Sequence, residues 1–380
     1  MVDILELYDV FKEDISSRYF PPKTVEKLIE IHQYKHEVIG KSFEDRNLYK
    51  LTFGQGNIKL LFWAQMHGNE TTAARAMFDL WKFLHLPEFS KHYAKVFEIH
   101  FIPQLNPDGA QYYSRRNSAQ IDINRDFNAE QSSEIQILKN LIQREKFDFL
   151  FNLHDQRSIF HPENKKYPAT LSFLAPVIDV ENSYSNAREK AINLISCMIN
   201  RLNVILPNQI ARFSHEFYPK ATGDNLQKAG WPTILIESGH YNNDYQRNSS
   251  RKFTFYAILS ALNALIEKEN ENIDANIYHQ TPINDNKAFD IIYKDVCLQR
   301  TSSQCITDIG IQFEEKLISN EIHFEARIAE IGDLSDYFGH DIYHAENRVF
   351  QNELNNLPKI GMLANFKIGN LIIKNGKPQE

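Results

Sequence analysis

Long apolar runs are missing from this sequence, and cysteine is scarce. No stretch approaches the roughly 18 consecutive apolar residues that span a bilayer, so we expect no membrane partner. The opening segment MVDILELYDVFKEDISSRYF lacks the basic start, apolar centre and small-residue cleavage site of a secretory signal. Cys197, Cys297 and Cys305 are an odd set without C-x-x-C spacing, which favours reduced thiols. These absences together predict a cytoplasmic protein.

An excess of basic residues is also missing. The chain has 42 Lys and Arg against 49 Asp and Glu, which gives a formal net charge of -7, and the basic residues are scattered rather than gathered in a stripe. Proteins that bind phosphate backbones carry such a stripe. The sequence therefore predicts no nucleic-acid partner.

The first two thirds of the chain alternate short apolar runs with helical patterns. This alternation is typical of an α/β fold with a mixed, largely parallel central sheet flanked by helices. The expected strands are residues 58–64, 96–102, 147–153 and 233–236, and the expected helices are 71–84, 132–143, 187–202 and 251–267. At 380 residues and 42% hydrophobic, the chain is long enough for one large core and a smaller second domain.

A charged segment, EKENEN at 267–272, follows the last of these helices and has the composition of a domain boundary. We expect a catalytic α/β domain over residues 1–268 and a small β-rich domain over 273–380. Beyond the boundary, residues 288–293 and 321–328 alternate apolar and polar side chains with the period of a strand, and 365–373 has the pattern of strand, turn and strand.

Each of the four expected strands of the α/β domain ends in polar residues. The first leads into His67-Gly68-Asn69-Glu70, the second into Asn106-Pro107-Asp108-Gly109, the third into His154 and the fourth into Glu237. In open α/β sheets, active sites lie outside the carboxyl ends of the strands. Two histidines and a glutamate are also a common ligand set for catalytic zinc. By itself, however, the His67-x-x-Glu70 pair fits a polar turn before a helix equally well.

The stretch between these strand ends makes the pattern specific. HGNE, NPDG, the RRN of Arg115-Arg116-Asn117, DINRDF at 122–127, a strand ending in His154 and a strand ending in Glu237 follow one another in order. This series resembles the zinc carboxypeptidase superfamily and covers residues 62–240. The resemblance implies a zinc-dependent hydrolase that holds one Zn²⁺ per chain.

The resemblance also implies a role for individual residues. His67, Glu70 and His154 would be the zinc ligands, and Asp122 would orient the ring of His67 through a hydrogen bond. Arg115, or its neighbour Arg116, would lie beside the scissile carbonyl. Asn124 and Arg125 would hold the terminal carboxylate of the substrate, Glu237 would be the general base, and Tyr218 would lie near the substrate.

The residue types suit this chemistry. Bound zinc lowers the pKa of its water toward ~7, and a nearby carboxylate such as Glu237 can take the proton as the water attacks a carbonyl. A fixed guanidinium stabilises the charge that develops on the carbonyl oxygen, a role that suits Arg115. The planar fork of Arg125 suits a free carboxylate, which is a feature of exopeptidases.

Two branches of the superfamily remain open. Gly68-Asn69 stands where the digestive carboxypeptidases carry an arginine, and HGNE is closer to the deacylase branch with succinylglutamate desuccinylase and aspartoacylase. NPDG and the RRN to DINRDF arrangement favour the carboxypeptidases. We therefore expect a metallocarboxypeptidase acting on peptides with a free carboxylate, with an N-acyl amino acid deacylase or a catalytically silent binding module as alternatives.

Side-chain specificity is expected to depend on residues between about 211 and 230. Within this range, Asp224 or Lys228 could select a charged substrate side chain.

Overall fold

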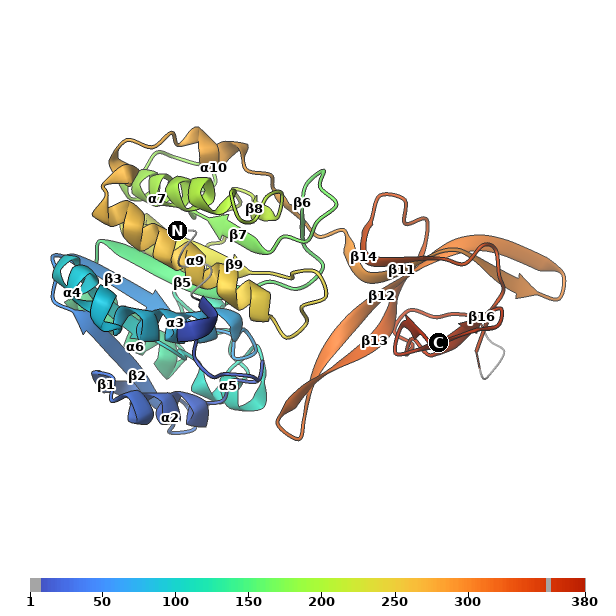
Figure 1. Ribbon diagram of the computed structural model, residues 1–380, viewed down its shortest axis with the longest axis horizontal. Helices are drawn as coiled ribbons and strands as arrows, with labels where there is room; N and C mark the ends of the chain where they lie inside the picture. The colour runs from blue at the N-terminus through green and yellow to red at the C-terminus, as the bar shows by residue number, and fades with distance from the viewer. Residues whose placement is uncertain (1–7, 353–356, 380) are drawn as a thin grey trace. The chain divides into compact units, whose positions relative to one another are not determined.

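The computed structural model describes residues 8–352 and 357–379. The chain forms two compact units (Figure 1). The larger unit holds the described residues up to Gln156 together with Ala169–Asn284, and the smaller unit holds Arg157–Pro168 together with the described residues from Asp285 onward. In the part of the chain that the structure describes, no helix is long and apolar enough to cross a membrane.

An eight-stranded sheet forms the centre of the larger unit, with the strand order β1-β2-β4-β3-β5-β9-β7-β8. The strands are β1 (His36–Lys41), β2 (Asn47–Gly54), β3 (Ile58–Trp63), β4 (Phe97–Ile102), β5 (Phe149–Asp155), β7 (Leu171–Leu174), β8 (Ile210–Arg212) and β9 (Thr233–Ser238). The four central strands β4, β3, β5 and β9 are parallel to one another, whereas β7 is antiparallel to β9. This mixed, largely parallel sheet confirms the fold class expected from the sequence.

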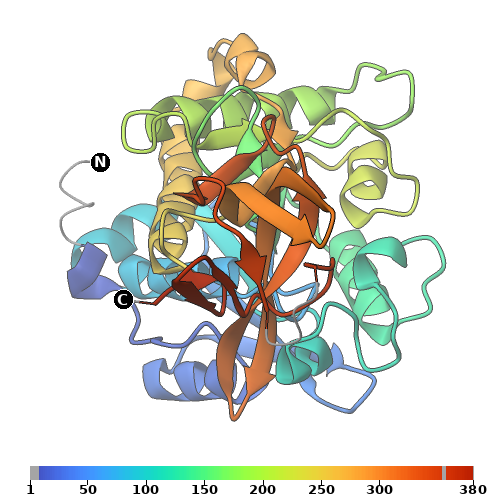
Figure 2. The same cartoon turned by 90° about the vertical axis from the view of Figure 1, so that its right-hand side faces the viewer.

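Helices cover both faces of this sheet. They are α2 (Pro22–His32), α3 (Thr72–Leu84), α4 (Pro87–Val96), α5 (Pro107–Tyr112), α6 (Ser133–Arg144), α7 (Asn186–Leu202), α8 (Thr222–Lys228), α9 (Asn248–Ile266) and α10 (Asn276–Gln280), with the short helices η1 (Ile123–Arg125) and η2 (Glu269–Glu271). In Figure 2, α3 and α9 lie on one side of the sheet and α6 on the other. The four helices expected from apolar periodicity correspond to α3, α6, α7 and α9.

The alternation of side chains along the strands assigns each residue to one of these two faces. Phe151 and Leu153 of β5, and Ile234 and Ile236 of β9, pack in the core that includes α3, α7 and α9. Leu150 packs in the other core, which includes α6 and Leu226 of α8. Because successive residues of a strand point to opposite faces, Asn152 and His154 of β5 share the face of α6 and α8.

Serine and asparagine side chains begin several helices. Ser132 accepts a hydrogen bond from Ile135 N at the start of α6, and Ser185 accepts one from Arg188 N at the start of α7. Such caps satisfy backbone N–H groups that have no partner in the first helical turn. A buried ion pair between Arg251 and Asp79 joins α9 to α3.

The smaller unit is β-rich, as the sequence predicts. A four-stranded sheet has the order β13-β12-β11-β14, and a second sheet runs from β15 to β18. The strands of this unit are β6 (His161–Pro162), β11 (Ala288–Arg300), β12 (Ser303–Ile318), β13 (Glu321–Gly332), β14 (Phe338–His344), β15 (Phe350–Gln351), β16 (Phe366–Ile368), β17 (Leu371–Lys374) and β18 (Lys377–Pro378), while β10 (Asn284–Asp285) falls at the division. Their apolar residues form a separate core around Ile291, Ile311 and Phe366.

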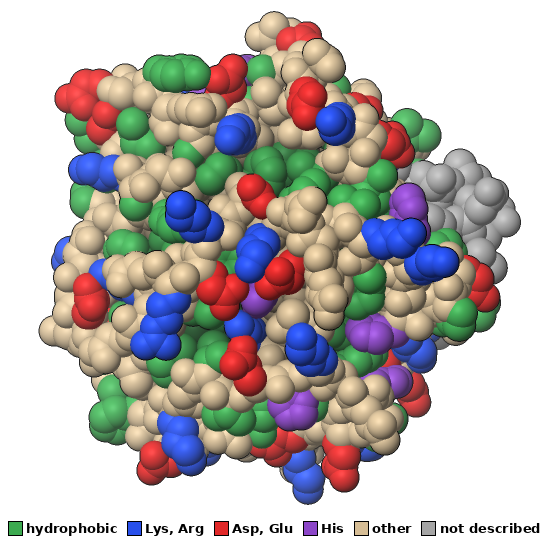
Figure 3. Space-filling model, turned by 90° about the vertical axis from the view of Figure 1, so that its left-hand side faces the viewer, with side chains coloured by type: hydrophobic (Ala, Val, Ile, Leu, Met, Phe, Trp, Pro, Cys, Tyr) green, Lys and Arg blue, Asp and Glu red, His purple; other side chains and the backbone are tan. Residues whose placement is uncertain are grey.

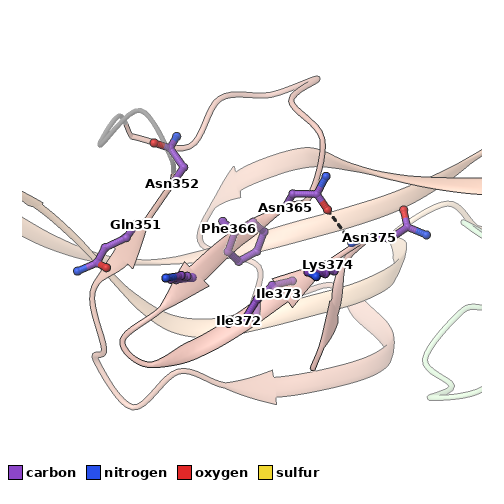
Figure 4. Close-up of a pocket in the computed structure, with 9 residues that line it drawn as sticks. Gln351, Asn352, Asn365, Phe366, Ile372, Ile373, Lys374 and Asn375 are labelled. Atoms are coloured by element: carbon purple, nitrogen blue, oxygen red, sulfur yellow. Dashed lines mark hydrogen bonds between the residues drawn. The ribbon is translucent and has the colours of Figure 1, made fainter. Parts of the chain in front are cut away.

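One face of the second sheet is hollowed by a cavity of about 570 Å³ (Figure 4). Its lining includes Lys367, Ile372 and Lys374, and Asn375 N donates to Asn365 Oδ1 at 2.8 Å beside it. The lining also includes Phe366 and Ile373, which are buried in the core of the smaller unit.

The observed division differs from the expected domain boundary in two places. The chain passes into the smaller unit at 284/285 rather than between 268 and 273, because η2 and α10 still belong to the larger unit. Arg201 of α7 binds Glu267 and Glu269 across this segment, so the charged stretch is a packed connection and not a linker. The insertion of residues 157–168 into the smaller unit had no signature in the sequence.

Acidic and basic side chains are mixed on the molecular surface. Figure 3 shows one face on which Lys and Arg alternate with Asp and Glu and with apolar residues. This mixing agrees with the scattered charges of the sequence.

Candidate metal centre and active site

The carboxyl ends of β3, β5 and β9 bring three of the sequence motifs to one edge of the sheet. Trp63 at the end of β3 lies opposite Asn152, and His154 lies opposite Glu237. The chain after β3 makes a tight turn through Gln65, which has a φ of 45° and whose Nε2 donates to Gly68 O at 2.8 Å. This turn directs His67 and Glu70 toward β5.

His67, Glu70 and His154 form a group whose ligand atoms all lie within 4.8 Å of one another. Nδ1 of His67 lies 2.7 Å from Glu70 Oε1, and Nδ1 of His154 lies 2.7 Å from Glu70 Oε2. Both imidazoles are 2% exposed, and Asp155 N donates to Glu70 Oε2 at 3.2 Å. The structure thus brings together the three residues that the sequence pattern selects as metal ligands.

The electrostatics of this group keep Glu70 ionised. Burial opposes its charge, but the two imidazoles outweigh burial and hold the pKa of Glu70 far below its usual range. At His154 burial is the largest effect and lowers the pKa, so a lone pair is available on the ring at neutral pH. At His67 burial also opposes the charged form, but Glu70 and Asp122 outweigh it and raise the pKa.

Asp122 lies on the far side of the His67 ring. His67 Nε2 is 3.2 Å from Asp122 Oδ1, so a proton on Nε2 is donated to Asp122 and the lone pair of Nδ1 is left on the side of Glu70, where it could bind a metal ion. Burial opposes ionisation of Asp122, but the hydrogen bond from His67 and the charges of His67 and Arg115 hold its pKa well below the usual range. This is the geometry by which a second carboxylate fixes a ligand histidine.

Arg115 and Arg116 diverge in the structure. Arg115 Nε donates to Asp122 Oδ2 at 3.1 Å, and its Nη1 is 3.3 Å from His67 Nδ1. Arg116 Nη1 instead donates to the backbone oxygen of Gln120 at 2.8 Å. Of the two arginines, Arg115 is therefore the one beside the ligand group, and its side chain is still 46% exposed.

Asn124 and Arg125 lie on η1, directly after Asp122. Asn124 is buried, and its Oδ1 accepts a hydrogen bond from Thr222 N of α8 at 3.2 Å. Arg125 is exposed, and its guanidinium lies 5.8 Å from the centre of the Tyr218 ring. Among the described residues no carboxylate forms an ion pair with Arg125, so its fork is available to a ligand.

Tyr218 is 52% exposed on the loop before α8. Its hydroxyl donates to Glu216 Oε2 at 2.8 Å, and its backbone N donates to Asp224 Oδ1 at 3.0 Å. Asp224 thus organises the loop that carries Tyr218. Lys228 is exposed and lies over the Phe217 ring at 5.6 Å.

Glu237 is half-buried at the end of β9 and has no hydrogen-bond or ion-pair partner among the described residues. Burial is the largest effect on its carboxyl group, and the negative charges of Glu70 and Asp155 add to it, so the pKa of Glu237 is raised well above the usual range for Glu. A carboxylate with a raised pKa and no partner is a suitable proton acceptor.

Two residues that support this centre escape prediction from the sequence. Asn106 caps α5 through Gly109 N, and its Nδ2 reaches the backbone oxygens of Met66 at 3.3 Å and Arg115 at 3.5 Å. Gly68 lies so close to Gly109 that a Cβ would be 1.9 Å from its carbonyl carbon. The NPDG segment therefore contacts both HGNE and the backbone of Arg115 and holds them together. In the sequence, this role is indicated by the glycine that each of the two motifs contains.

A second group with metal-ligand spacing comprises Glu98, His100 and Glu145. It lies at the amino-terminal end of β4, away from the carboxyl ends of the strands. Lys59 pairs with Glu98 at 3.2 Å and Lys50 with Glu145 at 3.3 Å, so cations of the chain already balance its carboxylates. Among the described residues no lysine pairs with the His67 group, although Arg115 Nη1 lies 3.6 Å from Glu70 Oε1.

The residues at the carboxyl edge fit a zinc ion. Two imidazole nitrogens and a carboxylate face one point, which is the donor set of a catalytic zinc site. Four carboxylates, those of Glu70, Asp122, Asp155 and Glu237, lie in this region. The guanidinium groups of Arg115, Arg247 and Arg18 offset part of their charge, and a bound cation would balance the remainder.

Comparisons with known proteins agree with the resemblance seen in the sequence. A family model of zinc carboxypeptidases matches residues 32–190. The structure is similar to carboxypeptidase A of Helicoverpa armigera, with 15% identity, coverage of 69% of this chain and 80% of that one, and a TM-score of 0.51. It is also similar to bovine thrombin-activatable fibrinolysis inhibitor, with 13% identity, coverage of 68% and 99%, and a TM-score of 0.52. The larger unit has the fold of these carboxypeptidases, and residues 32–190 are similar to the zinc carboxypeptidase family, in agreement with the resemblance carried by the sequence motifs.

A curated relative of Zymomonas mobilis, itself uncharacterized, is 27% identical over 134 residues. The match covers 33% of this chain and 35% of the relative, so the chain spans about a third of the length of that protein.

Proposed function

We propose that the chain is a zinc-dependent metallocarboxypeptidase that binds one Zn²⁺ per chain and hydrolyses the C-terminal peptide bond of peptides. The observation that carries this proposal is the exposed Arg125, which has no ion-pair partner among the described residues and follows by three positions Asp122, the residue that contacts His67. A guanidinium in this position suits the terminal carboxylate that distinguishes a carboxypeptidase substrate.

His67, Glu70 and His154 would hold the zinc, which when bound supplies a water of lowered pKa and a positive charge for a carbonyl oxygen. Glu237 would accept the proton of the attacking water and pass it to the leaving amine. Arg115, fixed by Asp122 on one side, would stabilise the charge that develops on the carbonyl oxygen. Tyr218 would close over the substrate from the loop before α8.

The deacylase alternative rested on Gly68-Asn69. The close approach of Gly68 to Gly109 gives a packing reason for the glycine that is independent of the substrate. This favours the carboxypeptidase over the N-acyl amino acid deacylase. All three cysteines are free thiols, which supports the proposed cytoplasmic setting.

The test combines metal analysis with a substrate panel. We expect one zinc per chain in the wild type, loss of this zinc in His154→Ala, and release of C-terminal residues from peptides with a free carboxylate but not from the same peptides with a C-terminal amide. Zinc with cleavage of N-acyl amino acids alone would move the protein to the deacylase branch. Absence of zinc from both proteins would reject the metal centre.

A further inference from the structure

Below Glu237 lies a group of buried polar side chains without partners. We call Asn152, Ser172, Thr222 and Gln227 the Asn152 cluster; each of the four is 0% exposed. Both Oδ1 and Nδ2 of Asn152, Oγ of Ser172, Oγ1 of Thr222 and Nε2 of Gln227 have no hydrogen-bond partner. Buried polar atoms are nearly always paired, so such a concentration of unpaired atoms indicates a ligand.

The strand register places the cluster directly under the proposed catalytic base. Ser172 of β7 lies opposite Glu237, and Asn152 of β5 lies opposite Leu235, one step further down the same face. Asn152 is two residues before the ligand His154, so their side chains point to the same side of the sheet.

Helix α8 brings the other two members over this face. A Cβ on Gly223 would lie 4.0 Å from Asn152 Nδ2, which is ordinary contact distance, and Thr222 precedes this glycine. Gln227 Oε1 accepts a hydrogen bond from Thr233 N at 3.0 Å, which fixes its side chain against β9 and leaves Nε2 unpaired.

The cluster also adjoins the residues proposed to hold the terminal carboxylate. Thr222 N donates to Asn124 Oδ1, and Arg125 is the next residue along η1. The cluster therefore lies on the face of the sheet that carries His154 and Glu237, and one hydrogen bond links it to the short helix that carries Arg125.

The cluster offers donors and acceptors without a net charge. Asn152 supplies two donor hydrogens and one acceptor, Gln227 supplies a donor, and the two hydroxyls supply either. Asp224, the carboxylate closest in sequence, is engaged by Tyr218 N, and burial raises its pKa to about 6. Lys228 is exposed and turned to Phe217.

Resting on the proposed carboxypeptidase function, we propose that the Asn152 cluster selects substrates whose C-terminal residue carries a carboxamide side chain, that is, glutamine or asparagine. A carboxamide has one acceptor and two donor hydrogens and so matches the cluster. An apolar side chain would leave the buried atoms unpaired, and a charged one would find no opposite charge among the four residues. Neither Asp224 nor Lys228 is then the selecting residue.

The test uses N-acylated dipeptides that differ only in the last residue: Gln, its near-isosteres Met and Glu, and Lys. We expect kcat/KM for Gln to exceed that for each of the others by about tenfold or more, because a site with buried hydrogen-bonding groups rejects side chains that lack them. Asn152→Leu should abolish this preference and raise kcat/KM for Met. Asn203→Leu, at an exposed asparagine, is the matched control and should retain the wild-type preference.

Binding and stability separate this proposal from the function on which it rests. Calorimetric binding of the same peptides to Glu237→Gln measures the preference without turnover. Asn152→Leu should unfold at no lower temperature than the wild type, because the Asn152 side chain makes no hydrogen bond. Equal kcat/KM for Gln, Met and Glu in an active enzyme would overturn the selectivity and leave the carboxypeptidase intact. Zinc-loaded protein that cleaves no free-carboxylate peptide would overturn the function, while a preference for Gln in binding would still support the cluster. A marked loss of stability in Asn152→Leu would show that the asparagine serves the fold and would reject the proposal.

Discussion

Glu237 is the residue on which the proposed chemistry depends most directly. Its partner-free carboxylate lies opposite His154, and removal of its charge should leave the three ligands in place. We expect Glu237→Gln to lower kcat by about 10²- to 10⁴-fold, the usual contribution of a general base, while it retains one zinc per chain by elemental analysis. Glu267→Gln, at a surface glutamate, should keep full activity. Loss of zinc from Glu237→Gln would mean that the residue belongs to the ligand set instead.

At the scale of elements, the turn between β3 and α3 depends on the close approach of Gly68 to Gly109. A Cβ at position 68 would lie 1.9 Å from the Gly109 carbonyl carbon and 2.2 Å from Ala110 N, and these backbone atoms cannot rotate away. We expect Gly68→Ala to destabilise the protein by about 1–3 kcal/mol, as overpacking does, and to weaken zinc binding. The adjacent Asn69→Ala, which loses a side chain whose Oδ1 is unpaired, should unfold close to the wild-type midpoint in urea. Equal stability of the two variants would contradict the packing argument.

The link between α3 and α9 gives a second prediction at this scale. Asp79 is 0% exposed and accepts hydrogen bonds from Arg251 Nε at 2.7 Å, Tyr8 Oη at 2.6 Å and Glu13 N at 2.7 Å. Asp79→Ala leaves the Arg251 charge buried and unpaired, so we expect a loss of about 3–5 kcal/mol in the free energy of unfolding. The double variant with Arg251→Met should lose less than Asp79→Ala alone, and a double-mutant cycle by denaturant unfolding measures the difference. Additive losses would show that the two side chains act independently.

The stability of the whole molecule depends on pH, and we expect His215 to make a measurable contribution to this dependence. The pKa of His215 is lowered from 6.5 to about 4. Burial is the largest cause, and the charges of Arg212, Arg188 and His279 add to it. The unfolded chain then takes up a proton below about pH 6.5 that the folded chain refuses until about pH 4, so stability falls as the pH drops through this window. We expect His215→Gln to show a shallower fall in melting temperature between pH 6.5 and 4.5. Parallel curves for the two proteins would indicate an ordinary pKa.

Much of the larger unit could be predicted because its central strands are apolar runs and its main helices have a strong period. β1, β7 and β8 could not, since β1 is largely exposed and the other two have three or four residues. The site residues were accessible through their order at strand ends, and the geometry adds that Arg115 rather than Arg116 turns to His67. The place of Asn152 within FLFNLHD becomes informative only when the strand register shows that it lies opposite Leu235 of β9. The contact of Asn106 with the backbone of Met66 joins residues that are distant in the sequence.

The insertion of residues 157–168 means that the backbone crosses between the two units three times, after Gln156, Pro168 and Asn284. A single proteolytic cut near 284 would therefore separate the chain from residue 285 onward, but residues 157–168 of the smaller unit would stay joined to the larger unit. The first crossing follows Asp155 by one residue, so β5, the strand that carries His154, leads directly into the smaller unit.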